Sequence, residues 1–334
     1  MRGLPSQRKG RAARWSTLAL AGLLLLSGCG GQSPSGSPAL SPQRDSAGSE
    51  ADSSQVAAAS ASAAGCDVLA SPHPMNPLPA AGAAMPSGST MARIQKRGRL
   101  IAGVDQNSYL WGYRDPGTGD LKGFDIDLVH EMARALFGDP DRVEFRTLSS
   151  AQRLTAAADG TVDLVAHSVT ITCERKQQVA FSADYFHDGQ RVLVNRSSTA
   201  RSLADLAGHK VCAAKDTTSI ATLTAARPKV VPVGVSDWTD CLVQLQLGEV
   251  DAVSTTEHIL QGLQAQDPET MIVGPAFTFE PHGIITAKRN TDLVRFVNAV
   301  LDRLRTDGTW ERIYARWMGR FGPVPDPPTP RYKD

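Results

Sequence analysis

The chain has 334 residues, of which 41% are hydrophobic and 21% charged. This composition is typical of a globular protein with one large or two smaller domains, and it argues against a multi-span membrane protein. The formal net charge is +1, but five basic residues and no acid fall in the first 28 positions, which leaves 30 basic against 34 acidic residues. A mildly acidic chain without a basic stripe argues against nucleic-acid binding, so we expect no nucleic-acid partner.

The N-terminus has the layout of an export signal. An apolar run from Leu18 to Leu26 follows the basic start and is too short to span a bilayer, which predicts a secretory signal at residues 1–28. The run ends in Leu26-Ser27-Gly28-Cys29, which resembles the lipobox of bacterial lipoproteins, where the cysteine is acylated. We therefore expect acyl chains on Cys29 to hold the chain on the outer face of the cell membrane. The alternative is an ordinary signal peptide with a chance cysteine.

A segment of small residues follows the predicted anchor. Of the 36 residues from 30 to 65, 27 are Ser, Ala, Gly or Pro and none is aromatic. Such a sequence buries too little apolar surface to offset its ordering entropy, so residues 29–90 are predicted to be a tether. Cys66 indicates that the last part, still rich in Pro and Ala, is attached to the folded region.

From residue 99 the pattern alternates short apolar runs with amphipathic stretches. In the first half we expect strands at 100–104, 143–146 and 162–166, and helices at 123–138 and 151–159. Asp125 is expected to cap the first of these helices and Gly138 to follow its last turn.

The same alternation restarts after residue 190. The expected strands are 191–195, 210–214, 229–233, 250–254 and 283–287, and the expected helices are 218–225, 237–247, 257 onward, 292–305 and 310–317. The alternation predicts an α/β fold with two parallel sheets. Ligands of such sheets bind at the carboxyl ends of the strands, so two facing sheets predict a binding cleft.

Five motifs occur in an order that resembles a known family. They are GFDIDL at 123–128, GTVDLVA at 160–166, TITCER at 170–175, FSADYF at 181–186 and GTW at 308–310. Over residues 91–320 the chain is similar to the family 3 extracellular solute-binding proteins, the receptor subunits of polar amino-acid ABC importers. The CER variant, WTDCL at 238–242 and VDAVST at 250–255 most resemble lipid-anchored glutamate-binding proteins of Gram-positive bacteria.

The resemblance implies a two-lobed Venus-flytrap fold of the type II class. Lobe 1 would comprise residues 91–187 with the return of 282–334, and lobe 2 residues 192–277. Two strand crossings, near 188–191 and 278–281, would form the hinge. The resemblance also implies a monomeric receptor that has no catalytic residues and no cofactor.

Five cysteines are present, and an acylated Cys29 would leave four in an exported chain, which suggests two disulfides. Three pairings are possible, and free buried thiols are the alternative. The lobe boundaries implied by the family place Cys212 and Cys241 together, which favours a Cys212–Cys241 bridge and leaves Cys66–Cys173. The cysteines lack CxxC spacing and the seven histidines are scattered, so we expect no metal site.

In lobe 1 the resemblance implies that Arg175 binds the ligand carboxylate, because a guanidinium offers a planar fork of donors to it. Thr170 and Ser168 align with ligand-contacting residues, and Asp105 with a polar contact at the cleft edge. Ser150 aligns where many relatives have an aromatic residue, which disfavours aromatic ligands. Arg153 and His167 are candidates for a side-chain carboxylate. The alternatives are a surface charge for Arg175, loop packing for Arg153 and ordinary strand-end packing for Thr170 and Ser168.

In lobe 2 the resemblance places Thr218 and Ser219 at a helix N-terminus that favours a carboxylate. Lys215 aligns with a position that contacts the ligand side chain in the family. The alternative is that Lys215 is a solvated surface charge. The family usually has an aspartate for the ligand ammonium where this chain has Thr256. Glu257 is displaced from it by one residue, so we expect either that Glu257 reaches back to the ligand or that it only begins the next helix.

Three functions fit these features. The first is a receptor that binds a small, acidic amino acid and delivers it to an ABC permease. The second is an amino-acid sensor of the same fold that docks on a membrane signalling protein. The third is an enzyme, because the same fold hosts a dehydratase, although no second acidic motif points to such chemistry.

Overall fold

The structure is a computed structural model that describes residues 65–334. The predicted signal, the predicted acylation site Cys29 and most of the predicted tether lie outside the described residues. Between residues 65 and 334, no helix is both long and apolar enough to cross a membrane.

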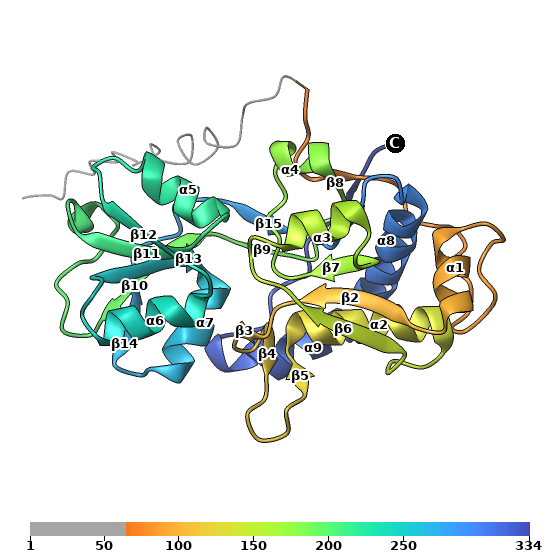
Figure 1. The fold of residues 1–334 in the computed structure, drawn as a ribbon, viewed down its shortest axis with the longest axis horizontal. Helices are drawn as coiled ribbons and strands as arrows, with labels where there is room; N and C mark the ends of the chain where they lie inside the picture. The colour runs from red at the N-terminus through yellow and green to blue at the C-terminus, as the bar shows by residue number, and fades with distance from the viewer. Residues whose placement is uncertain (1–64) are drawn as a thin grey trace, which may run out of the picture. The chain divides into compact units, whose positions relative to one another are not determined.

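Two five-stranded sheets form the centres of the two lobes (Figure 1). In lobe 1 the strand order is β6-β2-β7-β16-β8, with the bounds Val143–Thr147, Leu100–Val104, Leu164–Ala166, Ile285–Ala287 and Val179–Phe181. In lobe 2 the order is β12-β11-β13-β10-β14, with the bounds Val231–Val235, Lys210–Ala214, Ala252–Thr256, Gln190–Asn195 and Thr270–Val273.

Each sheet is mixed, so the prediction of two parallel sheets is wrong for the fourth strand of each. Strand β2 is parallel to β6 and β7, and β11 is parallel to β12 and β13. The fourth strand of each sheet, β16 or β10, runs antiparallel to its neighbours. Each of these two strands enters its lobe directly from the other lobe. Because it does not return through a crossover helix, it is free to run in the opposite direction.

The chain passes between the lobes through two paired strands. Strand β9 (Phe186–Asp188) runs antiparallel to β15 (Glu280–His282), with Glu280 opposite Asp188. This two-stranded connection is the hinge of the molecule (Figure 1).

Helices flank both sheets. The helices of lobe 1 are α1 (Thr90–Arg97), α2 (Phe124–Phe137), α3 (Arg153–Asp159), α4 (Cys173–Gln178), α8 (Thr291–Thr306) and α9 (Thr309–Met318). The helices of lobe 2 are α5 (Thr218–Ala225), α6 (Trp238–Gln246) and α7 (Glu257–Gln266). The remaining elements are short, namely β3 (Asn107–Ser108), β4 (Gly112–Arg114), β5 (Leu121–Lys122), η2 (Ala204–Leu206) and η3 (Gly319–Phe321).

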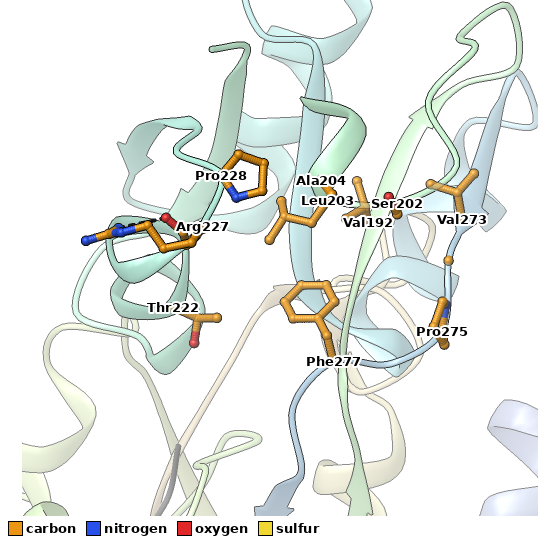
Figure 2. Close-up of a pocket in the computed structure, with 12 residues that line it drawn as sticks. Val192, Ser202, Leu203, Ala204, Thr222, Arg227, Pro228, Val273, Pro275 and Phe277 are labelled. Carbon is orange, nitrogen blue, oxygen red and sulfur yellow. Dashed lines mark hydrogen bonds between the residues drawn. The ribbon is translucent and has the colours of Figure 1, made fainter. Parts of the chain in front are cut away.

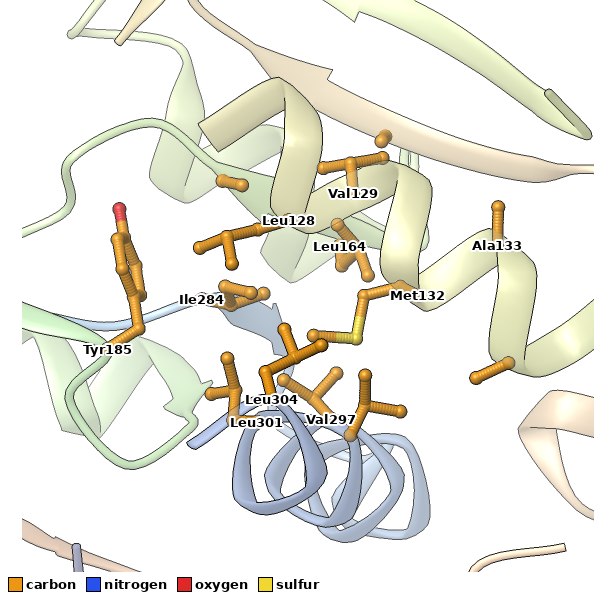
Figure 3. Close-up of a cluster of buried hydrophobic side chains, with 14 of the residues drawn as sticks. Leu128, Val129, Met132, Ala133, Leu164, Tyr185, Ile284, Val297, Leu301 and Leu304 are labelled. Carbon is orange, nitrogen blue, oxygen red and sulfur yellow. The ribbon is translucent and has the colours of Figure 1, made fainter. Parts of the chain in front are cut away.

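The core of lobe 1 lies between α2, α8 and the sheet. Figure 3 shows Met132 of α2 facing Val297, Leu301 and Leu304 of α8, and all four side chains are buried. The apolar spacing of both helices, which recurs every three or four residues, produces this contact. The buried layer holds the strands of lobe 1 in place, and with them the loops at the strand ends.

Helix α2 begins differently from the prediction. Gly123 is its N-cap and has a φ of 133°, and a Cβ at this position would lie 2.3 Å from the Trp111 carbonyl oxygen. Asp125 is already inside the first turn, and its carboxylate accepts hydrogen bonds from the Tyr185 hydroxyl (2.8 Å) and the Ser168 N–H (3.0 Å). Asp125 therefore supports the loop after β7 and does not cap the helix.

The described part of the predicted tether packs onto lobe 1. Strand β1 (Ala70–Ser71) pairs with the C-terminal β17 (Arg331–Tyr332), and Met85 is buried in the lobe 1 core. Asn298 of α8 donates to the Ser71 hydroxyl at 2.8 Å and to the Pro72 carbonyl at 2.7 Å. The expectation that the stretch after Cys66 is attached to the folded region is therefore confirmed, whereas the predicted tether boundary at residue 90 is wrong.

Each lobe contains one disulfide, and both bridges have the expected pairing. Cys212 of β11 is bonded to Cys241 of α6 within the core of lobe 2, where both residues are fully buried. Cys66 is bonded to Cys173 at the start of α4. The second bridge fixes the segment after Cys66 to the helix that carries Arg175.

Candidate functional site

A polar cavity lies where the carboxyl ends of the strands of both sheets meet. It encloses about 330 Å³, part of which is open to solvent. Lobe 1 lines it with Asp105, Ser108, Arg153, His167, Ser168 and Thr170. Lobe 2 lines it with Thr217, Thr218, Ser219, Trp238, Thr255, Thr256 and Ile259, and the hinge contributes His282. Eight of the twelve predicted ligand-binding residues thus line one cavity at the place where α/β sheets bind ligands.

Arg153 is the cation in the cavity wall. It is the first residue of α3, it is 4% exposed, and its Nη1 donates to the His167 carbonyl oxygen at 3.1 Å. Among residues 65–334, its Nε finds no hydrogen-bond partner. Burial, reinforced by the nearby Arg175, lowers the pKa of Arg153 to about 9, so the side chain remains charged at neutral pH. A buried cation with an unused donor favours an anionic ligand group.

Arg175 lies behind the cavity wall. Its Nη1 donates to the carbonyl oxygen of Thr170 at 2.9 Å, and its Nη2 is 3.4 Å from the Asp216 carbonyl oxygen in lobe 2. Burial lowers the pKa of this guanidinium. The side chain therefore bridges the two lobes next to Thr170, although it lies outside the cavity lining.

Asp105 follows β2 and is already occupied by donors of its own loop. Its carboxylate accepts from the N–H groups of Gln106 (2.7 Å) and Asn107 (3.0 Å) and from the Ser108 hydroxyl (2.5 Å). His167 lies beside it, with Nδ1 3.9 Å from the Asp105 carboxylate and Nε2 2.9 Å from the Leu148 carbonyl oxygen. The contact with Leu148 requires a proton on Nε2, so that nitrogen is a donor.

Ser168 has an unusual backbone conformation. Its φ is 45°, which costs energy for a residue other than glycine. Its N–H donates to the Asp125 carboxylate at 3.0 Å, and its hydroxyl lies 3.2 Å from Nε2 of His258. Burial raises the pKa of Asp125 to about 6. The buried carboxylate and the histidine hold this turn in place at the cavity wall.

The lobe 2 wall consists of hydroxyl groups and a helix end. Thr217 caps α5 and accepts from the Ile220 N–H at 3.3 Å, while the first-turn N–H groups of Thr218 and Ser219 have no intrahelical partner by geometry. The Ser219 hydroxyl donates to Thr255 Oγ1 at 3.1 Å. Thr218 Oγ1 donates to the Glu280 carboxylate at 2.9 Å and lies 3.3 Å from Thr170 Oγ1 of lobe 1. This wall therefore favours a carboxylate at the start of α5.

Glu257 does not reach back into the cavity, which contradicts one of the two expectations for it. Its carboxylate is 2.6 Å from Nη1 of Arg191, and its backbone N–H donates to the Gly189 carbonyl oxygen. The neighbouring Thr256 does line the cavity. Arg191, at the entrance of lobe 2, thus holds Glu257 on the outside of the site.

Two further predicted residues lie outside the lining. Lys215 is exposed, and its aliphatic chain covers Gly234, where a Cβ would lie 3.0 Å from Lys215 Cγ. Ser150 is buried in the turn before α3. Neither side chain belongs to the cavity wall of this structure, although both are close to it in sequence.

The prediction missed six lining residues. Ser108, Thr217 and Thr255 lie within three positions of predicted residues, so sequence proximity is a signal that could have included them. Trp238 and Ile259 are apolar residues of α6 and α7 with no distinguishing pattern. His282 belongs to the second hinge strand, where sequence reasoning expected only a crossing.

The hinge carries a cluster of two histidines and one aspartate. Asp188 accepts from His258 Nδ1 at 2.8 Å and lies 3.4 Å from His282 Nε2. Burial alone would raise the pKa of Asp188, but His258 and His282 hold it below its usual range. Burial also lowers the pKa of His282. Asp188 is therefore a carboxylate at neutral pH, and His282 is a neutral imidazole.

A second cavity lies in lobe 2 and is mostly apolar. It encloses about 790 Å³ including space open to solvent, and Figure 2 shows Leu203, Phe277 and Pro228 facing it. The Arg227 side chain at its border donates to the backbone oxygens of Ala225 and Ala226. An apolar surface offers little to a charged ligand, so the polar cavity between the lobes is the candidate site.

Comparisons with known proteins agree on one family. A family model of the bacterial extracellular solute-binding proteins, family 3, matches residues 100–320, which include both five-stranded sheets. The chain is 32% identical over 230 residues to the ABC transporter glutamine-binding protein GlnH of Bacillus subtilis, covering 69% of this chain and 84% of GlnH. It is 28% identical over 253 residues to the glutamate-binding protein GluB of Corynebacterium efficiens, covering 69% of this chain and 85% of GluB.

A solved structure of an ancestral arginine-binding protein bound to glutamine is similar to this chain, with a TM-score of 0.63 and 34% identity. The match covers 67% of this chain and 99% of that protein. The two-lobed architecture described above is therefore shared with amino-acid-binding proteins.

Proposed function

Because the chain belongs to the bacterial extracellular solute-binding proteins of family 3, we propose that it binds a small acidic amino acid between its lobes and delivers it to an ABC permease. The relatives GlnH and GluB are named for binding glutamine and glutamate, which supports an amino-acid ligand. The proposed role is binding and not catalysis.

The buried guanidinium of Arg153 is the observation that supports an acidic side chain on the ligand. This guanidinium lines the cavity with an unpaired Nε. A second carboxylate on the ligand would pair with this cation, whereas a neutral amide would leave the charge uncompensated. Glutamate or aspartate therefore fits the lobe 1 wall better than glutamine.

The main-chain carboxylate of the ligand is assigned to Arg175 and the start of α5. Arg175 already contacts the backbone oxygens of Thr170 and Asp216 across the lobes, so it can turn to a ligand that enters between them. The N–H groups of Thr218 and Ser219 would face the same carboxylate. In this arrangement the ligand itself connects the two lobes and stabilises closure.

The ligand ammonium is assigned to neutral acceptors. Thr256 lines the cavity at the end of β13, and Ser168 and Thr170 face it from lobe 1. Among the described residues that line the cavity, the one carboxylate, Asp105, already accepts three hydrogen bonds. Lys215 and Ser150 do not line this cavity, so neither side chain is assigned to the ligand.

The cellular arrangement is proposed from the N-terminal sequence. The family is extracellular by its description, and Leu26-Ser27-Gly28-Cys29 supports an acyl anchor on Cys29. A monomeric receptor on the outer face of the membrane would then present its ligand to a permease in the same membrane. Replacing Cys29 by Ala should remove acyl labelling and membrane retention, and unchanged retention would contradict the anchor.

Titration calorimetry tests the ligand class. The mature chain with Cys29→Ser is titrated with glutamate, aspartate, glutamine and asparagine, and we expect the two acids to bind more tightly than their amides. In Arg153→Gln the preference should shift toward the amides by about tenfold or more, since the unpaired cation is gone. Tighter binding of glutamine by both proteins would overturn the acidic assignment while preserving the receptor.

A further inference from the structure

Three side chains that are far apart in sequence converge at the hinge. Asp188 ends β9, His282 ends β15, and His258 lies in the first turn of α7 in lobe 2. Asp188 is 70 positions from His258 and 94 from His282. These separations explain why the histidines looked scattered and why the sequence predicted no metal site.

The three potential ligand atoms have suitable spacing for one ion. His258 Nδ1, His282 Nε2 and an Asp188 carboxylate oxygen all lie within 4.8 Å of one another. A tetrahedral zinc with bonds of about 2.0–2.1 Å separates its ligand atoms by about 3.4 Å. The contact between Asp188 and His282 already has this length, 3.4 Å, and that between Asp188 and His258 is shorter at 2.8 Å. These two contacts are made by different oxygens of the Asp188 carboxylate, so binding of an ion requires a small rearrangement that brings one oxygen to face both ring nitrogens.

The surroundings hold these side chains in position. The other ring nitrogen of His258, Nε2, lies 3.2 Å from the Ser168 hydroxyl, as a metal-bound histidine usually requires of its second nitrogen. The His258 ring packs 4.0 Å from the Trp111 ring, and the His282 ring stacks on Phe186. Both histidines are 1% exposed, and the Asp188 side chain, at 13%, gives the cluster a route to solvent.

We propose that Asp188, His258 and His282 form a binding site for a divalent transition-metal ion of the zinc type, with water as a fourth ligand. Two imidazoles and one carboxylate are a donor set for Zn²⁺, Co²⁺ or Ni²⁺, whereas Mg²⁺ and Ca²⁺ take oxygen ligands. Two ligands belong to the two hinge strands and the third to lobe 2. The bound ion fixes α7 against the hinge in the arrangement that this structure shows.

The site is separate from the ligand anchors Arg153 and Arg175, but His282 also lines the polar cavity. Metal binding and amino-acid binding are therefore coupled through one ring. Because both favour the same lobe arrangement, each should strengthen the other. The metal site itself does not depend on the identity of the amino acid.

Calorimetry with Zn²⁺ alone tests the site in the untagged mature chain with Cys29→Ser, after EDTA treatment and dialysis. We expect one Zn²⁺ per chain, and a Co²⁺ visible spectrum typical of tetrahedral nitrogen and oxygen ligands. His258→Gln and His282→Gln should each weaken Zn²⁺ at least about a hundredfold, because even outer partners of a metal site contribute about 10–100-fold.

Two controls separate this site from others. His209→Gln removes an exposed histidine that lies 3.3 Å from Asp251, and it should leave Zn²⁺ binding unchanged. Arg175→Ala should weaken amino-acid binding about a hundredfold but leave Zn²⁺ binding unchanged, so failure of the proposed ligand does not mimic failure of the metal site. Absence of Zn²⁺ binding by the parent protein, or equal binding by His258→Gln as judged in folded protein by circular dichroism, would show that the cluster is held by hydrogen bonds only.

Discussion

The two lobes share a sheet topology but line the cavity in different ways. In both sheets the first three strands are parallel and the fourth, which arrives from the other lobe, is antiparallel. Lobe 1 brings Arg153, Asp105 and His167 to the cavity, whereas lobe 2 brings hydroxyl groups, a helix N-terminus and apolar side chains. The same strand order thus places charge on one wall and neutral donors on the other.

This difference assigns different tasks to the lobes. Buried charges require a partner, so the lobe 1 wall selects ligands that carry charge. The hydroxyl and N–H groups of lobe 2 are neutral, so their desolvation costs little, and they can bind a ligand in many orientations. Such a wall is suited to closing over a ligand that is already bound to lobe 1. Lobe 1 therefore provides specificity in this proposal, and lobe 2 provides closure.

The largest effect is expected from the disulfide of lobe 2. Replacing both Cys212 and Cys241 by Ala removes a bridge between residues 29 positions apart, which in the chain-entropy model costs about 3–4 kcal/mol. Both positions are fully buried in the lobe 2 core. Urea unfolding with and without reductant measures the loss of unfolding free energy. The double mutant lacks this bridge, so reductant should affect it only through the Cys66–Cys173 bridge.

This change also tests whether the lobes behave as separate units. If only lobe 2 is weakened, unfolding should show two transitions, with lobe 1 retaining the Cys66–Cys173 bridge. Stability equal to that of the parent protein would mean that the bridge contributes nothing in solution.

The next largest effect concerns the lobe 1 anchor. Arg175→Ala should weaken binding of the amino-acid ligand by about 3 kcal/mol, or about a hundredfold in affinity, because the ligand carboxylate stays buried without its partner. Arg175→Lys is the matched control, since it keeps the charge but loses the planar fork, and it should recover part of the affinity. Calorimetry at constant ionic strength measures both, and a loss below threefold for Ala would place the carboxylate elsewhere.

Local patterns predicted the parts of the molecule that depend on near neighbours. Strands such as β2 and β11 are short apolar runs, and their ends at Asp105 and before Thr217 point to the site. The orientation of polar side chains depends instead on partners distant in sequence. Asp125 turns inward because Tyr185 and Ser168 donate to it, and Glu257 turns outward because Arg191 pairs with it. No periodicity encodes such partners.

The same limit applies to the hinge and to the antiparallel strands. Asp188, His258 and His282 come together only after both crossings are in place, so neither their spacing nor their residue types indicated a cluster. The direction of β10 and β16 follows from the way the chain enters each lobe, which the alternation of helices and strands does not record.

The smallest effects concern the lobe 2 wall, where charge is missing. Glu257→Gln should leave amino-acid affinity within about twofold of the parent, because its carboxylate pairs with Arg191 and such partly exposed pairs contribute little.

Thr256→Asp should instead strengthen glutamate binding about tenfold, because it places an anion opposite the ligand ammonium. Glutarate, which lacks the ammonium of glutamate, is the matched ligand. Thr256→Asp should weaken glutarate by adding a buried negative charge, and calorimetry with both ligands measures the contrast. If glutamate and glutarate respond alike, the ammonium does not face Thr256, and the neutral lobe 2 wall has no part in recognising it.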